Sequence, residues 1–232
     1  MGIPKKTKFL RDAEKISSNL SHRSTILFNM GKYHAAVAAG NKRYANIDEA
    51  KNRAANIKQH ALKNLSKYLV EFESNHIKNG GNVLWASNSH EALTHIKQIL
   101  TQHNVTTVVK SKSMTTEEIE LNEELEKIGI ASIETDLGEY IVQLAGEKPY
   151  HIVTPAMHKS KQDVADLFHD KFGVSKDLTA EELTAVAGEN LRKKYIEAGA
   201  GITGANFIVP DLGGIAVSEN EGNAIMSTAF PN

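Results

Sequence analysis

The spacing of apolar residues changes at the Asn-Gly-Gly run of residues 79–81, and this change constrains the fold more than any other feature. Before it, apolar side chains recur at steps of three and four residues, which predicts helices. After it, short apolar runs typical of buried strands alternate with helical segments, which predicts a mostly parallel sheet covered by helices on both faces. We therefore expect a basic helical extension at residues 1–79 that packs on an α/β domain at residues 80–232.

The boundaries of the expected elements follow from these runs and from capping residues. Helices are expected at residues 8–21, 24–40, 48–79, 88–100 and 115–128, and after Ser160 and Thr179. Strands are expected at residues 83–86, 105–110, 130–134, 140–144, 151–153, 205–209 and 214–218. The strand at residues 140–144 follows its predecessor too closely for a crossover helix, so we expect an antiparallel pair and a mixed sheet.

The composition is that of a globular protein without disulfide bonds. Hydrophobic residues make up 41% of the chain and charged residues 24%, the balance of a protein that buries a sizeable core. The sequence has no cysteine, no secretory signal and no apolar run long enough to cross a membrane. We therefore expect a cytoplasmic protein without a transmembrane segment.

Charge is distributed unevenly along the chain. Residues 1–63 hold 13 Lys and Arg against 4 Asp and Glu, a net charge of +9, whereas the remainder holds 14 against 24, a net charge of −10. The basic part suits nucleic acid, a membrane or an acidic partner, but a solvated face that complements the acidic body of the same protein is the favoured interpretation. No nucleic-acid motif accompanies the charge, so we expect no nucleic-acid partner.

Three polar segments follow predicted strands, and the first is the Lys-Ser-Lys-Ser-Met-Thr-Thr run of residues 110–116. In open α/β sheets, ligands bind beyond the carboxyl ends of parallel strands. The run combines the cations Lys110 and Lys112 with four hydroxyl groups and a helix N-terminus, which suits a carboxylate or phosphate. The alternative is a solvated loop in which Thr115 caps the next helix.

The second segment places Glu134 and Glu139 on either side of an Asp-Leu-Gly turn. A glutamate near another carboxylate at a strand end can have a raised pKa and serve as a general acid or base. We expect Glu139 to lie at a solvent-accessible strand end. The alternative is that Asp136 and Gly138 only form a turn and both glutamates are solvated.

The third segment is the Ser-Glu-Asn-Glu-Gly-Asn run of residues 218–223. Its glycine allows the backbone to approach a ligand and exposes N–H donors, although the run would also serve as a polar turn capping a helix at Ala224. Thr203 and Gly204 add a hydroxyl group and a tight backbone point before a late strand. The glycine-rich run at residues 199–204 is not a dinucleotide fingerprint, because it follows a helix and precedes a strand.

The ten histidines do not form a metal-binding pattern. His90 and His95 lie five residues apart on one predicted helix, about 140° around its axis, so they face apart. His151 and His158 are candidates to line the site, but surface or hydrogen-bonded structural roles are the favoured interpretation for all the histidines. We expect no metal ion in this chain.

Taken together, the three segments resemble the LUD-domain family of lactate-utilisation proteins, and in particular its iron–sulfur members; the resemblance runs from about residue 41 to the end. It implies the fold group of ribose-phosphate isomerases, glucosamine-phosphate deaminases and CoA-transferases, a three-layer α/β/α arrangement with a mostly parallel mixed sheet. The family pattern has a glutamate at the position of Glu139, which makes this residue the first choice for a catalytic acid or base. The Asn-Glu-Gly-Asn run is itself typical of the family.

The resemblance also implies a role, partners and a cofactor. The role is that of a component of an L-lactate oxidation system, with sister lactate-utilisation subunits and a small 2-hydroxy acid or other anionic ligand as partners. Iron–sulfur members hold [4Fe–4S] clusters in a cysteine-bearing module after the LUD domain, and this sequence has no cysteine. We therefore expect no cofactor in this chain, no activity from it alone, and clusters in a longer protein of which it is a piece. A relative that naturally lacks clusters is the alternative.

These arguments define one set of candidate site residues, with Glu139 as the candidate catalytic group. The candidate ligand-binding residues are Lys110, Ser111, Lys112, Ser113, Glu134, Thr203, Gly204, Asn220, Glu221, Gly222 and Asn223. We expect members of all three segments to converge on one cleft at the strand ends. Two other functions stay open. One is a non-catalytic assembly scaffold, and the other is an acyl- or CoA-transferase using Glu219 or Glu221. The second rests on residues 218–223, which are similar to the Ser-Glu-Asn-Gly pattern of one CoA-transferase class but contain one additional glutamate.

Overall fold

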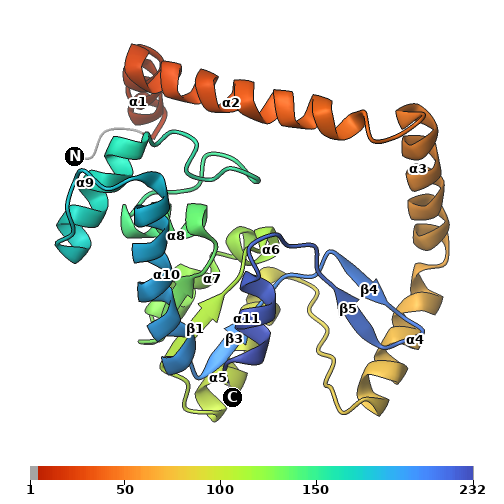
Figure 1. Ribbon diagram of the computed structural model, residues 1–232. Helices are drawn as coiled ribbons and strands as arrows, with labels where there is room; N and C mark the ends of the chain where they lie inside the picture. The colour runs from red at the N-terminus through yellow and green to blue at the C-terminus, as the bar shows by residue number, and fades with distance from the viewer. Residues whose placement is uncertain (1–4, 232) are drawn as a thin grey trace. The chain divides into compact units, whose positions relative to one another are not determined.

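The computed structural model describes residues 5–231, which form an α/β structure (Figure 1). The helices are α1 (Lys5–Ser17), α2 (Leu20–Asn41), α3 (Ile47–Lys63), α4 (Leu65–Lys78), α5 (Ser89–Gln102), α6 (Met114–Glu118), α7 (Leu121–Glu126), α8 (Leu137–Leu144), α9 (Lys161–Phe172), α10 (Ala180–Glu197) and α11 (Asn223–Ala229). The strands are β1 (Thr107–Lys110), β2 (Ala131–Glu134), β3 (Ala200–Ile202), β4 (Phe207–Val209) and β5 (Gly214–Ala216).

The chain divides into two compact units. The first comprises the chain up to Asp48 together with Ile141–Leu183, and the second comprises Glu49–Tyr140 together with the chain from Thr184 on. The predicted boundary near residue 79 stays a prediction.

A three-stranded parallel sheet is the centre of the second unit. The strand order is β2-β1-β3, and β1 pairs in parallel with both neighbours. In this register Lys110, the last residue of β1, lies between Glu134 of β2 and Ile202 of β3. The three strands therefore end together, and the segments that follow them leave from the same edge.

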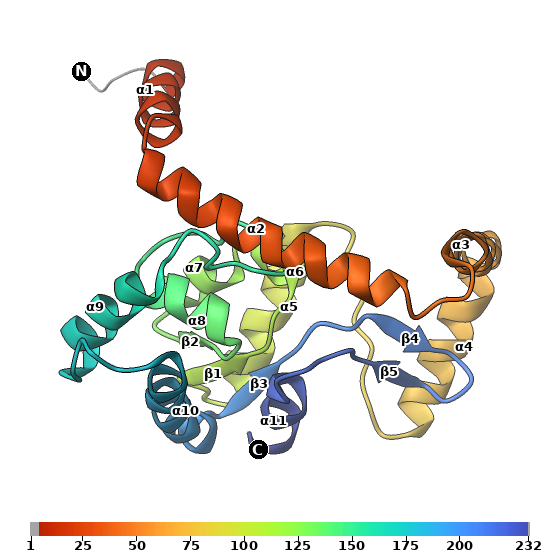
Figure 2. The same cartoon turned by 45° about the horizontal axis from the view of Figure 1, so that its top comes forward.

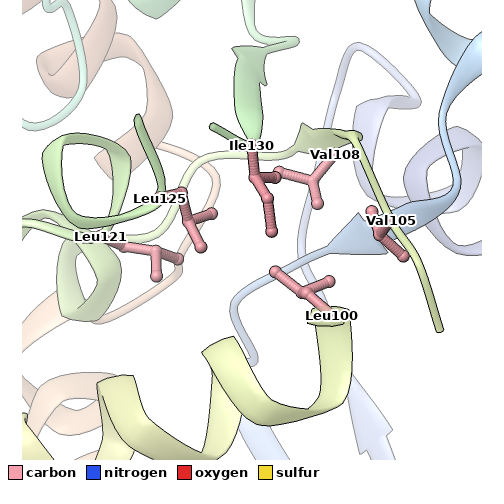
Figure 3. Close-up of a cluster of buried hydrophobic side chains, with 6 residues drawn as sticks. All are labelled: Leu100, Val105, Val108, Leu121, Leu125 and Ile130. Atoms are coloured by element: carbon pink, nitrogen blue, oxygen red, sulfur yellow. The ribbon is translucent and has the colours of Figure 1, made fainter. Parts of the chain in front are cut away.

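Helices cover both faces of this sheet, so the expected three-layer α/β/α class is confirmed (Figure 2). On one face, α5 and α7 pack against the sheet through the buried side chains of Leu100, Val105, Val108, Leu121, Leu125 and Ile130 (Figure 3). Val109 points to the opposite face, because successive side chains alternate across a strand. There α11 packs on β3 and β1, and α10 contributes the buried Tyr195.

The sequence pattern does not predict β3, which is short and contains a glycine. A side chain is excluded at Gly201, because a Cβ there would lie 1.6 Å from the carbonyl oxygen of Ser227 in α11. The close approach of α11 to the sheet therefore requires glycine at this position.

The first unit contains α1, α2 and α9, with Phe168 and Ala165 fully buried in its core. The predicted helix start at Ser160 is confirmed. Ser160 and Asp163 form a reciprocal capping box, and the helix ends at Gly173, whose φ of 71° is left-handed.

The predicted strand at residues 140–144 is wrong, because these residues belong to α8. The apolar residues Leu137, Tyr140, Ile141 and Leu144 are spaced by three, one and three, which places them along one side of a helix. The antiparallel pairing expected for residues 140–144 does not occur, because the three-stranded sheet formed by the described residues contains only parallel pairs. The antiparallel pair of the second unit is instead a separate two-stranded ribbon, β4–β5.

Four other predictions of local structure need correction. Residues 83–86 and 151–153 form no strand, and Trp85 is half-exposed rather than part of a sheet. The long helix expected at residues 48–79 is two helices, α3 and α4, which meet at Asn64. The helix expected at residues 115–128 is also two, α6 and α7, because Glu120 between them is left-handed with a φ of 53°.

Candidate functional site

Three polar segments meet at the carboxyl edge of the parallel sheet, the location at which open α/β sheets bind ligands. Backbone pairing continues one residue beyond the strands: Ser111 N–H donates to the carbonyl of Ile202 at 2.9 Å, and Thr135 N–H donates to the carbonyl of Lys110 at 3.0 Å. We name the polar side chains here the strand-end cluster, which comprises Lys110, Ser111, Lys112, Glu134, Asp136, Glu139, Thr203 and Glu221.

Lys110 and Glu134 form a buried ion pair within the strand-end cluster. Lys110 Nζ lies 2.7 Å from Glu134 Oε1, and the two side chains are 1% and 6% exposed. Asn122 donates to the same carboxylate oxygen at 2.7 Å, and Lys110 Nζ donates to Thr116 Oγ1 at 3.2 Å. Lys110 Nζ and Glu134 Oε1 are thus engaged by protein groups, and both side chains are shielded from solvent.

Lys112 and Glu139 form a second ion pair with a different exposure. Lys112 Nζ lies 2.7 Å from Glu139 Oε1, and the lysine side chain is 28% exposed whereas the glutamate side chain is 6% exposed. The expectation of a solvent-accessible Glu139 is therefore wrong: the residue is buried in the first turn of α8. Burial raises the pKa of Glu139, and the neighbouring Lys112 ammonium opposes that rise.

The backbone of Lys112 is also held by a carboxylate, because its N–H donates to Asp136 Oδ2 at 2.6 Å. The sequence interpretation assigned Asp136 only to a turn. Its position two residues after β2 and three before Glu139 lets one segment hold both the backbone and the side chain of Lys112.

Two hydroxyl groups join β1 to β3 at this edge. Ser111 Oγ donates to Thr203 Oγ1 at 2.7 Å, and Thr203 Oγ1 donates to the carbonyl of Gly204 at 3.1 Å. A Cβ at Gly204 would lie 3.3 Å from Ser113 Oγ, so the two segments pack closely. Ser113, not Thr115, caps the next helix, since its hydroxyl accepts from the N–H of Thr116 at 3.3 Å.

The third polar segment is divided between capping and the strand-end cluster. Glu219 accepts from the backbone N–H groups of Ala224 at 2.6 Å and Ile225 at 3.2 Å, at the start of α11. Glu221 accepts from the N–H of Leu137, the first residue of α8, at 3.3 Å. The turn expected at Ala224 is therefore present, and Glu221 also ties it to the segment of Glu139.

The other residues predicted in this segment have distinct positions. Asn223 donates from Nδ2 to Glu221 Oε2 at 3.0 Å, and Gly222 adopts a φ of 79° that favours glycine. Asn220 is exposed. The expectation of one ligand cleft shared by all three segments stays a prediction.

A buried tyrosine near the strand-end cluster was missed by the sequence interpretation. Tyr195 of α10 donates from its hydroxyl to Asn223 Oδ1 at 3.5 Å, and burial raises the pKa of that hydroxyl. The helical spacing of Tyr195 predicts only a core position, and nothing in the sequence indicates that its hydroxyl contacts Asn223 of the third polar segment.

The described residues contain no group of three or more His, Asp or Glu side chains arranged to hold a metal ion. An iron–sulfur cluster requires cysteine thiolates, and the sequence has none, so the residues of this chain do not fit such a cluster. Of the helices in residues 5–231, none combines the length and apolar character needed to cross a membrane.

Comparison with known proteins identifies the family. The LUD domain model matches residues 69–232, which include the parallel sheet and the whole strand-end cluster. The chain belongs to the LUD-domain family. No solved structure matches it significantly.

Several curated relatives of this LUD protein carry the name Lactate utilization protein B. The one from Geobacillus sp. (strain WCH70) is 40% identical over 222 residues, which cover 94% of this chain and 47% of the relative. Those from Bacillus cytotoxicus and Lysinibacillus sphaericus are 42% and 45% identical and cover 80% and 79% of this chain, in each case 39% of the relative. The chain thus spans less than half the length of these relatives.

Proposed function

We propose that this chain is the LUD portion of an iron–sulfur protein of an L-lactate utilisation system, and that its strand-end cluster binds the small 2-hydroxy acid. The name of its relatives supports the system, and the position of the cluster beyond three parallel strands supports ligand binding. Sister lactate-utilisation subunits are its proposed partners.

The observation that carries the proposal is the pair formed by Lys112 and Glu139. The cation is accessible to solvent and its partner carboxylate is not. The carboxylate of a 2-hydroxy acid replaces Glu139 as the partner of Lys112 Nζ, while the hydroxyl groups of Ser111 and Thr203 lie on the neighbouring strand ends to bind its oxygens.

Glu139 is suited to act on the 2-hydroxyl of the bound acid. When Lys112 turns to the ligand, Glu139 loses the ammonium that opposes the effect of burial, so its pKa rises further. A carboxylate with a raised pKa is a stronger base, and Glu139 accepts the hydroxyl proton. Electron transfer is assigned to [4Fe–4S] clusters outside this chain, because its own residues offer no thiolate.

Calorimetric titration with L-lactate tests the proposal, with propionate as a ligand that lacks only the 2-hydroxyl. We expect L-lactate to bind and propionate to bind more weakly, since Glu139 loses its hydrogen-bonding partner. We expect Lys112→Met to weaken lactate binding by on the order of tenfold or more, the usual loss for a hydrogen bond to a charged group.

Lys97→Met is the matched control for Lys112→Met. Lys97 also pairs with a glutamate, Glu124, and its side chain is 27% exposed, but it lies outside the strand-end cluster. Equal affinity of all three proteins for lactate would show that Lys112 does not hold the ligand.

A non-catalytic assembly scaffold is the second candidate function. It is favoured by the fact that Lys110, Glu134 and Glu219 are all engaged with protein groups. A scaffold would bind neither lactate nor pyruvate. Binding of a CoA ester instead, lost in Glu221→Gln, would favour the acyl- or CoA-transferase alternative.

The proposed division of labour also predicts that this chain is redox-inert. After anaerobic incubation with iron and sulfide, we expect no visible charge-transfer band, and we expect lactate to reduce no dye. A brown protein, or dye reduction that depends on lactate, would contradict the placement of the clusters outside this chain.

A further inference from the structure

The long helix α2 contacts its own unit through polar and aromatic side chains. His22, Asn29 and Tyr33 are spaced by seven and four residues, which places them on one side of the helix. Asn29 donates from Nδ2 to the carbonyl of Met157 at 2.8 Å, and the rings of His22 and Tyr150 meet edge to face with centroids 5.5 Å apart. These contacts fix which side of α2 faces the unit and leave the opposite side outward.

The outward side of α2 carries three large apolar side chains. Leu20, Leu27 and Phe28 are 76%, 68% and 62% exposed. Leu20 and Leu27 lie seven residues apart, so they share one side, and Leu27 lies about 140° around the axis from His22. Cations flank this stripe: Arg23 is exposed beside it, and Lys32 Nζ lies 4.3 Å from the centroid of the Phe28 ring.

All formal charge in this region is positive. Residues 15–47 contain five Lys and Arg and no Asp or Glu. We name the exposed apolar and basic side chains on the outward side of α2 the basic apolar surface; it comprises Leu20, Arg23, Leu27, Phe28 and Lys32.

We propose that the basic apolar surface binds the surface of an anionic lipid bilayer. Exposed leucine and phenylalanine side chains can enter the acyl boundary of a membrane while the cations beside them meet the lipid phosphates. Charge selects this occupant, because residues 15–47, which include this surface, carry no acidic residue, whereas residues 64–232 have a net charge of −10 and are repelled from anionic lipid. This role is independent of the proposed binding of a 2-hydroxy acid.

Vesicle co-sedimentation of the whole chain tests this role. We expect the protein to pellet with vesicles of equimolar phosphatidylglycerol and phosphatidylcholine, and to stay in solution with vesicles of phosphatidylcholine alone. Added salt should reduce binding, because screening weakens attraction to the lipid charges. We expect Leu27→Ser/Phe28→Ser and Arg23→Gln/Lys32→Gln each to weaken binding by at least about tenfold.

Phe207→Ser/Leu212→Ser is the matched control, because both residues are largely exposed but lie in the β4–β5 ribbon and the turn that joins its strands. It should bind vesicles as the parent chain does, and circular dichroism should show unchanged helix content in every variant. Equal pelleting with neutral vesicles, or unaltered binding by Leu27→Ser/Phe28→Ser, would overturn the proposal. So would a dimer in analytical ultracentrifugation that is lost in this variant without any vesicle binding, because the occupant would then be a second copy.

Discussion

Two lysine–glutamate pairs lie at the carboxyl edge of the sheet, and they differ mainly in access to solvent. Lys110 and Glu134 end adjacent strands, face each other in register and are both buried. Lys112 and Glu139 lie just beyond the strands, where the lysine reaches solvent and the glutamate does not. We call Lys110–Glu134 the inner pair and Lys112–Glu139 the outer pair. The inner pair is a contact between buried strand ends, whereas the lysine of the outer pair is accessible to solvent.

The largest effect is expected from breaking the inner pair. Lys110→Met leaves Glu134 as a buried charge without its cation, and removing one partner of a buried pair typically costs about 3–5 kcal/mol. We expect a loss of this size in the free energy of unfolding, measured by urea denaturation followed by circular dichroism.

The double variant Lys110→Met/Glu134→Gln separates charge from packing. A glutamine at position 134 carries no charge and still accepts from Asn122, so the double variant should be more stable than Lys110→Met alone. If the double variant is the less stable of the two, an unpaired charge is not what destabilises Lys110→Met.

Breaking the outer pair should change the pKa of Glu139 rather than the stability of the fold. Lys112 opposes the effect of burial on Glu139, so Lys112→Met should raise the pKa of Glu139 further. Carbon-detected NMR of the glutamate carboxyl groups would measure the shift. The pKa of Glu124, which Lys127 and Lys97 lower to about 2, should stay unchanged in this variant and serves as an internal reference.

Binding of lactate should also raise the pKa of Glu139, but by less than Lys112→Met does. If lactate takes Lys112 from Glu139, the pKa of Glu139 rises on binding, and protons are taken up at a pH near that pKa. Titration calorimetry in two buffers of different ionisation enthalpy would detect the uptake. A binding enthalpy that is the same in both buffers would show that the ligand leaves the outer pair intact.

The two pairs also show which features of the site could be predicted from the sequence. The site was placed at strand ends because β1 and β2 are short apolar runs that pattern analysis recognises, and both predicted strands are confirmed. Which lysine meets which glutamate depends on strand register, and a shift of one residue would turn Lys110 away from Glu134. Pairing and burial are tertiary properties, so neither could be predicted from the sequence.

The missed elements have a related cause. The apolar residues of α8 fit a strand when read consecutively and a helix when read at steps of three and four, and tertiary packing decides between them. The short β3 contains Gly201, which pattern analysis treats as a break, whereas the structure requires it for the approach of α11. Asp136 was assigned only to a turn, because hydrogen bonding to the backbone of Lys112 leaves no mark in the sequence.

The smallest effect is expected from Glu139→Gln, and its sign depends on pH. Burial raises the pKa of Glu139, so its contribution to stability is fully present below the ordinary glutamate pKa and is lost as pH rises through the folded-state value. Near neutral pH the buried charge is costly, and glutamine removes that cost while it weakens the contact with Lys112. The two changes offset, so we expect the free energy of unfolding in urea at neutral pH to differ from that of the parent chain by at most about 0.5 kcal/mol, and the variant to be less stable than the parent chain by a larger amount in acid.

Glu124→Gln is the control of opposite sign. The lowered pKa of Glu124 stabilises the fold above the ordinary glutamate range, and this contribution is lost as pH falls towards 2. A large loss of stability for Glu139→Gln at neutral pH, comparable with that of Lys110→Met, would show that the outer pair holds the fold together as the inner pair does.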